Sequence, residues 1–169
     1  MKKVFLGILL IGTLALVACG DEAEFEIEQE IVFIYQSFLW GEGGDLEQNW
    51  GFFIDNQGNT VDFQLSGMDW EYVKIEKLYS YLLELDNPQR TQYISMVDLK
   101  TCYDNLLQID ENAEIEEEFV SMHAGSGCLY GVIDDGETSP AFILLSEDGN
   151  VERRNTDEHA KNILDILLR

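Results

Sequence analysis

The sequence predicts an α+β domain in which antiparallel strands and hairpins pack with about three helices. Two observations lead to this fold class. Several segments are rich in β-branched and aromatic residues or alternate apolar with polar residues, and glycine-containing turns join some of them, which predicts antiparallel strands. Three other segments carry apolar residues at helical spacing. Antiparallel strands backed by helices form an α+β architecture.

The first predicted strand follows an acidic stretch. Residues 21–30 are mostly acidic and are interpreted mainly as a tether, although Phe25 and Ile27 alternate with glutamates as they would at the start of a strand. Residues 31–40 are rich in β-branched and aromatic side chains, which predicts a strand. The glycine-rich residues 41–45 are expected to form a loop.

A hairpin is predicted next. Residues 50–55 and 60–65 flank the sequence Asn56-Gln57-Gly58-Asn59, in which glycine is available for a positive φ. Apolar and polar residues alternate along the second of these strands. One face of the predicted sheet is therefore expected to be exposed to solvent.

Three helices and three further strands complete the prediction. Asp69 is a candidate cap for a helix over residues 70–85, which Pro88 ends, and a second helix is expected over residues 95–109. The last helix is expected to start at Asn155 or Thr156. Strands are predicted at residues 119–122, 129–134 and 141–146, with turns at residues 134–136 and 147–150.

The two hairpin turns resemble each other, and a helix follows each of them. Residues 53–59 and 144–150 match in their turn chemistry, which raises a weak pseudo-duplication of a meander-plus-helix unit. Because Asp, Asn and Gly are common in all turns, coincidence explains this match better than descent does.

The first twenty residues have the features of an export signal. Lys2 and Lys3 precede an uncharged apolar run over residues 4–18, which is shorter than the roughly 20 residues of a membrane-spanning helix. The run ends in Leu16-Val17-Ala18-Cys19. This sequence resembles the lipobox of bacterial lipoprotein precursors at all four positions. An ordinary cleaved signal fits less well, because Leu16 stands where such a signal needs a small residue.

The resemblance implies that Leu16, Val17 and Ala18 are recognised by the signal peptidase and that Cys19 carries a diacylglyceryl group. Two or more acyl chains hold a protein stably on a membrane. We therefore expect residues 1–18 to be a lipoprotein signal peptide and residues 19–30 to be the lipidated cysteine and its tether. Residues 31–169 are expected to form a single domain on the extracytoplasmic side of a bacterial membrane. The sequence does not specify the leaflet.

The charge of the chain disfavours two classes of partner. There are 33 acidic against 10 basic residues, a net charge of −23, and removal of Lys2 and Lys3 with the signal changes it to −25. Nucleic acid is disfavoured because phosphates are bound by lysine and arginine. Anionic headgroups are repelled, so we expect membrane contact through the lipid on Cys19 alone. The charge is typical of a solvated surface and also suits a cationic peptide, a basic protein or Ca²⁺.

Two cysteines remain in the mature domain. Export through an oxidising compartment slightly favours a disulfide between Cys102 and Cys128. The alternative is a buried free thiol, because Cys102 shares a predicted apolar helix face with Leu99, Tyr103 and Leu106.

No motif predicts catalysis, a cofactor or a metal. The two histidines, His123 and His159, are too few for a multi-histidine zinc site. His123 and Cys128 are near enough in sequence for a thiol and its base, but no third group orients them. The acidic stretches around residues 55–59 and 110–114 lack the glycine and glutamate of an EF-hand.

The three tryptophans lie in apolar segments, so we expect core packing rather than an exposed platform for a glycan or peptide; they are Trp40, Trp50 and Trp70. The sequence as a whole predicts a lipid-anchored, non-enzymatic envelope protein that binds a protein or peptide partner. A module for a small ligand, a glycan or a divalent cation is the alternative. A thiol-dependent enzyme that uses Cys128 is the third hypothesis.

Overall fold

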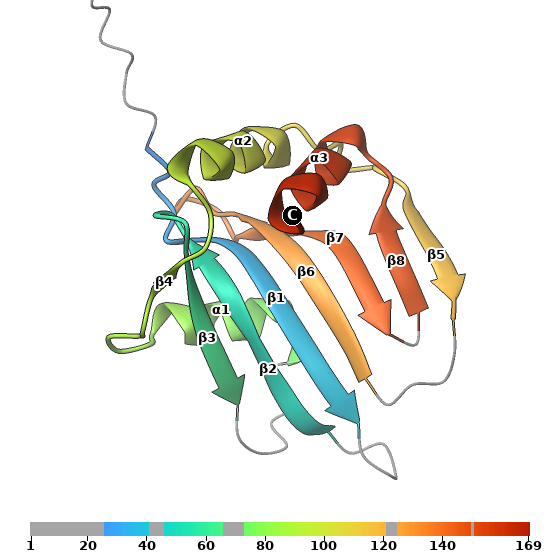
Figure 1. The fold of residues 1–169 in the computed structure, drawn as a ribbon, viewed down its shortest axis with the longest axis horizontal. Coiled ribbons are helices and arrows are strands. Elements are labelled where there is room, and N and C mark those ends of the chain that lie inside the picture. Colours follow the sequence, from blue (N-terminus) through green and yellow to red (C-terminus); the bar gives the residue numbers. More distant parts are fainter. Residues whose placement is uncertain (1–25, 41–45, 66–72, 121–124, 150) are drawn as a thin grey trace, which may run out of the picture.

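The computed structural model describes residues 26–40, 46–65, 73–120, 125–149 and 151–169, and it confirms the α+β class. Within these residues, eight strands form one antiparallel sheet in the order β4-β3-β2-β1-β6-β7-β8-β5 (Figure 1). The elements in chain order are β1 (Ile31–Trp40), β2 (Leu46–Asp55), β3 (Asn59–Leu65), α1 (Ile75–Leu83), β4 (Thr91–Gln92), α2 (Met96–Leu106), β5 (Ile115–Phe119), β6 (Gly125–Ile133), β7 (Ala141–Gly149), β8 (Val151–Asn155) and α3 (Glu158–Leu167).

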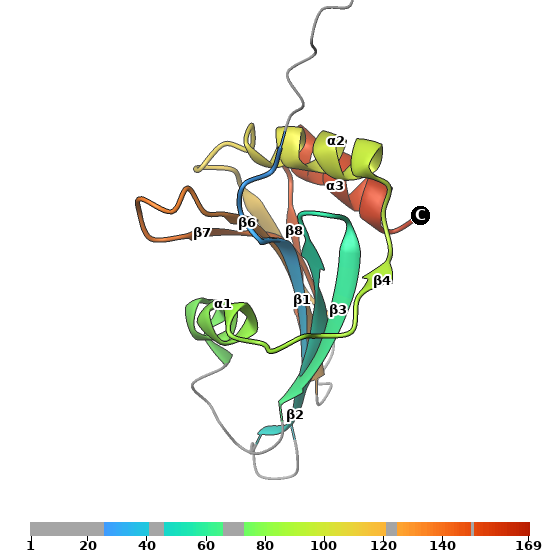
Figure 2. The ribbon, with the colours of Figure 1, turned by 90° about the vertical axis from the view of Figure 1, so that its left-hand side faces the viewer.

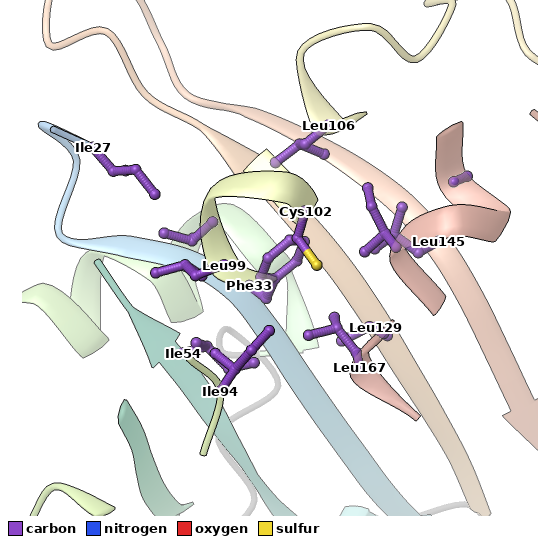
Figure 3. Close-up of a cluster of buried hydrophobic side chains, with 13 residues drawn as sticks. Ile27, Phe33, Ile54, Ile94, Leu99, Cys102, Leu106, Leu129, Leu145 and Leu167 are labelled. Carbon is purple, nitrogen blue, oxygen red and sulfur yellow. The ribbon is translucent and has the colours of Figure 1, made fainter. Parts of the chain in front are cut away.

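Helices pack on both faces of the sheet, so the domain has three layers (Figure 2). We call the face under α2 and α3 the front face and the face under α1 the back face. On the front face, buried side chains of β1, β2, β6 and β7 meet Leu99, Cys102 and Leu106 of α2 and Ile163 of α3 (Figure 3). On the back face, the core consists of Ile31, Ile34, Phe53, Val61, Phe63 and Val132 from the sheet with Leu78, Tyr79 and Leu82 from α1.

The folded domain begins earlier than the predicted boundary at residue 31. Ile27 is 4% exposed and belongs to the front core, and Gln29 is 7% exposed. The Gln29 side-chain N–H groups donate to the carbonyls of Ile31 (2.7 Å) and Val132 (2.8 Å). Residues 27–30 are therefore part of the fold, and the predicted tether is shorter by these four residues.

The first strand and the following hairpin are confirmed. β1 has the predicted bounds, and β2 and β3 are joined by the predicted turn, in which Gly58 has a φ of +77°. The buried Asp55 carboxylate accepts the backbone N–H of Gln57 and of Asn59, each at 2.9 Å. Arg90 pairs with the same carboxylate at 3.1 Å, so the turn is held by one acidic side chain.

The helices were predicted better than the C-terminal strands. α2 begins after Ser95, whose hydroxyl accepts the N–H of Asp98. α3 begins later than the predicted Asn155 or Thr156, because Asn155 belongs to β8 and the carboxylate of Asp157 caps the helix by accepting the N–H of His159. α1 begins at Ile75, after the predicted start at residue 70. The candidate cap Asp69 lies outside the described residues, as does the predicted loop at residues 41–45.

The polar strands β5 and β8 differ from the prediction. β5 occupies Ile115–Phe119 and shares only Phe119 with the strand predicted at residues 119–122, of which residues 121 and 122 lie outside the described residues. β8 occupies Val151–Asn155, where no strand is predicted. Neither strand shows alternating burial. They form by antiparallel pairing with each other, and Arg153 of β8 bonds to Glu117 of β5 at 2.8 Å. β7 also continues to Gly149, through part of the predicted turn.

The weak pseudo-duplication holds for the strands and fails for the helices. β3-β2-β1 and β6-β7-β8 are two antiparallel meanders that meet at the β1–β6 pair. A two-fold axis relating them would have to be perpendicular to the sheet, and such an axis keeps each face of the sheet on its own side. The helices that follow the two meanders, α1 and α3, lie on opposite faces (Figure 2). The meander-plus-helix unit is therefore not repeated.

Candidate functional site

Helices α2 and α3 cover only part of the front face. They pack over Phe33, Ile54 and Leu129, which are nearly inaccessible to solvent (Figure 3). The strands extend beyond these helices (Figure 1). There, front-facing Tyr35 and Phe52 are only half-buried. The uncovered part of this face is consequently lined by aromatic rings.

Four rings form what we call the aromatic strip: Tyr35 of β1, Trp50 and Phe52 of β2, and Tyr93, which follows β4. The rings of Tyr35 and Phe52 are stacked, with centroids 5.3 Å apart. Trp50 meets Tyr35 edge-on at 6.2 Å, and Tyr93 lies 6.2 Å from Phe52. Trp50 is 43% exposed and Tyr93 is 50% exposed. These are the distances of favourable aromatic pairs, so the strip is an ordered surface and not a set of independent rings.

A glycine on the neighbouring strand allows the ring of Tyr35 to lie against the sheet. Gly127 of β6 pairs with Ser37 of β1, and a Cβ atom on Gly127 would come within 2.5 Å of the Tyr35 hydroxyl. Any other residue at this position would push the ring away from the sheet. The strip therefore depends on a small residue at position 127.

A shallow groove runs along β2 and β3 beside the strip. It has a volume of about 590 Å³ and is lined by Trp50 and Phe52 together with Gln48, Asp62 and Gln64. The last three side chains are exposed. The volume is within the range of ligand sites, but the groove is open and has more the form of an interaction surface than of an enclosed pocket.

The chemistry of this surface suits binding. Aromatic ring faces attract cations, the Asp62 carboxylate accepts charge-assisted hydrogen bonds, and the two amides both donate and accept. An exposed aromatic patch with a polar border is typical of sites that bind other proteins or ligands.

The two domain thiols lie on opposite faces of the sheet and are not bridged. Cys102 belongs to the front core under α2, whereas Cys128 packs with Phe38 and Leu46 on the back face. The expected disulfide between them is therefore not formed, because the sheet separates the two sulfur atoms.

Burial makes both thiols poor nucleophiles. Burial raises the pKa of Cys102 to about 12, with a smaller effect of Asp98 in the same direction. Burial, helped by the nearby Glu147 carboxylate, raises the pKa of Cys128 to about 11. A catalytic cysteine needs a lowered pKa, because the thiolate is the reactive form. The environment of Cys128 thus argues against the hypothesis of a thiol-dependent enzyme that uses this cysteine.

The histidines do not complete a catalytic pair in the described structure. His123 lies outside the described residues. His159 is in the first turn of α3, and its Nδ1 atom lies 3.0 Å from the side-chain oxygen of Asn105 in α2. This contact joins the two front-face helices, which is a structural role.

Several predicted features lie outside the described residues or their described side chains. These are the signal segment, the lipobox residues Leu16, Val17, Ala18 and Cys19, the whole of Trp70, and the side chain of Trp40. Trp50 was expected in the core, and this expectation is wrong, because nearly half of the side chain is exposed. In the described ranges, no helix is long and apolar enough to span a membrane, and no three acidic, histidine or cysteine side chains are gathered as metal ligands.

Comparison with protein families, with characterised proteins and with solved structures finds no match to this chain.

The aromatic strip was not predicted as a site. Tyr35, Trp50 and Phe52 are spaced as ordinary strand residues, and strand periodicity alone does not tell which part of a face a helix will cover. The available signal was the cross-strand register, which places Tyr35 opposite Phe52 and Ser37 opposite Trp50. With that register known, the three rings would have been expected on one face.

Proposed function

We propose that this protein is a bacterial lipoprotein that is anchored through Cys19 and binds a basic protein or peptide partner on its aromatic strip, without catalysing a reaction. The single observation that carries the binding part is the ordered row of Tyr35, Phe52 and Trp50, which lies on the part of the front face that α2 and α3 leave uncovered. The anchoring part rests on the lipobox sequence at residues 16–19.

The charge distribution supports a basic partner. Three arginines of the domain are already paired with acids: Arg90 with Asp55 and Glu30, Arg153 with Glu117 and Glu147, and Arg154 with Asp148. The chain retains a large acidic excess, and Asp62 borders the groove beside the strip. A field of one sign attracts a partner of the opposite sign and speeds encounter.

The tether limits how far the domain stands from the membrane. Six residues lie between Cys19 and Glu26, where the described chain begins, so the seven Cα–Cα steps span at most about 25 Å when extended. The chain enters the fold beside α2 (Figure 1). Tyr35 lies four residues along β1 from Ile31, about 13 Å further from that entry point. The strip is therefore displaced along the sheet from the end of the domain at which the anchored chain enters.

The test is capture of a partner by the full-length protein in its own membranes. The protein would be crosslinked in cells and purified as wild type, Trp50→Ala, Val97→Ala and Cys19→Ser. Val97 of α2 is 76% exposed and is not among the residues of the strip or of its groove, so Val97→Ala is a matched control for loss of exposed apolar surface. We expect one envelope protein to be enriched with wild type and Val97→Ala, and lost with Trp50→Ala.

Two results would overturn parts of the proposal separately. Equal capture by Trp50→Ala and wild type, with both folded, would remove the strip as the binding site. Recovery of Cys19→Ser in the membrane fraction at the level of wild type would remove the lipid anchor.

A further inference from the structure

One edge of the sheet is open along most of its length. β3 lies at this edge, and β4 pairs only with Asn59 and Thr60. In the described part of the chain, no strand pairs with the outer side of residues 61–65. In an unpaired edge strand, alternate residues direct their N–H and C=O groups outward, where another strand can bond to them.

Grooves flank this edge on both faces of the sheet. The front groove of about 590 Å³ and a second cavity of about 440 Å³ share three lining residues, Asp62, Phe63 and Gln64. The second cavity is completed by Tyr81, Leu85 and Pro88, from α1 and the segment after it, and by the polar residues Asp86, Gln89 and Thr91. An added strand would therefore have space for side chains on each face.

The two faces of β3 differ in chemistry. Asp62 and Gln64 are front-facing and exposed, whereas Val61 and Phe63 are buried on the back face under α1. The side chains of an added strand would alternate in the same way. Those on the front would lie beside Asp62, and those on the back would lie beside Phe63, Tyr81 and Leu85.

The opposite edge of the sheet lacks this arrangement. All five residues of β5 are exposed, and Phe119 is 68% exposed. A strand added to β5 would gain backbone hydrogen bonds, but it would lie beside exposed side chains alone.

We propose that the basic partner binds as an extended strand on the open edge of β3, with basic side chains over Asp62 and apolar side chains in the groove by Tyr81 and Leu85. This inference rests on the proposed function, since it names the form in which the partner engages the surface beside the aromatic strip. The backbone supplies affinity and the alternating side chains supply specificity, as in other additions of a strand to a sheet edge.

The probe is a synthetic seven-residue peptide in which lysine and valine alternate, blocked at both ends. Binding to the full-length lipoprotein in detergent would be measured by titration, and amide exchange would be followed by mass spectrometry. Two control peptides have the same composition with the lysines in one block, or glutamate in place of lysine. We expect only the alternating basic peptide to bind and to slow amide exchange in residues 61–65.

Backbone methylation of the peptide separates strand pairing from charge attraction without changing the protein. Alternate residues of an added strand bond to β3, so N-methyl groups on one alternate set should weaken binding about tenfold, and those on the other set should leave it unchanged. Equal binding by the block isomer, equal effects of the two methyl sets, or protection confined to β5 would each overturn the inference.

Protein variants distinguish failure of this inference from failure of the proposed function. Asp62→Lys should weaken peptide binding, whereas Asp165→Lys, an equal charge change at an exposed position of α3, should not. If Trp50→Ala abolishes partner capture while Asp62→Lys and the methyl sets change nothing, the edge inference is wrong and the proposed function stands. If the two sets of N-methyl groups differ in their effect on peptide binding but Trp50→Ala captures the partner normally, the aromatic strip is not the binding site and the edge inference stands.

Discussion

At the scale of single residues, the buried amide of Gln29 joins three parts of the fold. Its N–H groups bond to the carbonyls of Ile31 and Val132, and its oxygen accepts the Tyr103 hydroxyl and the backbone N–H of Asp134, each at 3.1 Å. All donors and the acceptor of the amide are thus used, which is the condition under which burying it is favourable. The segment next to the proposed tether is fixed to α2 and to the end of β6 by this one side chain.

The first prediction follows from this network. Gln29→Leu should lower the free energy of unfolding by about 2–4 kcal/mol, because two buried and two part-buried hydrogen bonds are lost. Gln29→Glu should cost at least as much at pH 7, because a carboxylate oxygen would face two carbonyls. Urea unfolding of residues 20–169 measures both, with the exposed Gln57→Leu as the control. Equal stabilities of Gln29→Leu and Gln57→Leu would contradict the prediction.

The second prediction concerns the two thiols. Both pKa values are raised from an ordinary 9.0 by burial, to about 11 for Cys128 and about 12 for Cys102. The folded state therefore holds these protons more tightly than the unfolded state does. Their contribution to stability is fully present below pH 9 and is lost as the pH rises toward 11 and 12. Each thiol should lower the free energy of unfolding by about 1 kcal/mol between pH 9 and 10.

Urea titrations at pH 8, 9 and 10 check this dependence, with thiol labelling in urea to count free cysteines. Cys128→Ala should show a shallower decline above pH 9 than the parent, whatever its stability at pH 8. Fewer than two reactive thiols in the unfolded, non-reduced chain would show a disulfide instead and would contradict the structure.

At the scale of elements, the strands and helices that were predicted are mainly those whose apolar residues form a local pattern in the sequence. β1 and the β2–β3 hairpin were predicted because their apolar residues and turn glycine carry a local signal, and α2 and α3 because their apolar residues recur at helical spacing. The cap of α3, Asp157, was not predicted. β5, with the sequence IEEEF, and β8, with VERRN, carry no such signal. Their pairing comes from backbone bonds and from contacts such as Arg153 with Glu117, which are distant in sequence.

The third prediction tests the close approach of the hairpin turn to the chain after β4. Gly58 and Gly136 have similar φ angles, +77° and +70°. A Cβ atom on Gly58 would lie 2.4 Å from the carbonyl oxygen of Ile94, whereas one on Gly136 would meet nothing within 4 Å. Gly136→Ala should therefore cost about 1 kcal/mol for backbone strain alone, and Gly58→Ala clearly more.

Thermal and urea unfolding of the two alanine variants measures this difference. Since the Gly58 carbonyl also accepts the backbone N–H groups of Tyr93 and Ile94, displacement of the turn should loosen β4 as well. Amide exchange should then rise at Tyr93 and Ile94 in Gly58→Ala and not in Gly136→Ala. Indistinguishable stabilities of the two variants would contradict the close approach.

At the scale of the whole molecule, the fold class could be predicted from the sequence, whereas the candidate site could not. The open aromatic strip exists because α2 and α3 stop short of Tyr35 and Trp50, and the open edge exists because β4 has only two residues. Both depend on where distant elements end. No local pattern in β1, β2 or β3 carries that information.

The fourth prediction also belongs to the whole molecule, because it follows from the net charge, which is −23 for the full chain and −25 without Lys2 and Lys3. Acidic side chains repel one another more in the compact state than in the unfolded chain, so the fold is destabilised by the same field that would attract a basic partner. Raising NaCl from 10 to 150 mM shortens the screening length from about 30 to 8 Å. We expect the free energy of unfolding of residues 20–169 to rise by about 1 kcal/mol over this range, while binding of the alternating lysine–valine peptide weakens.

CaCl₂ and MgCl₂ at equal ionic strength should stabilise the protein equally if screening is the cause. A larger effect of Ca²⁺ alone would show a specific cation site, and a fall in stability with NaCl would contradict the prediction. If NaCl raises the stability and weakens peptide binding, the acidic surface of the domain determines both properties.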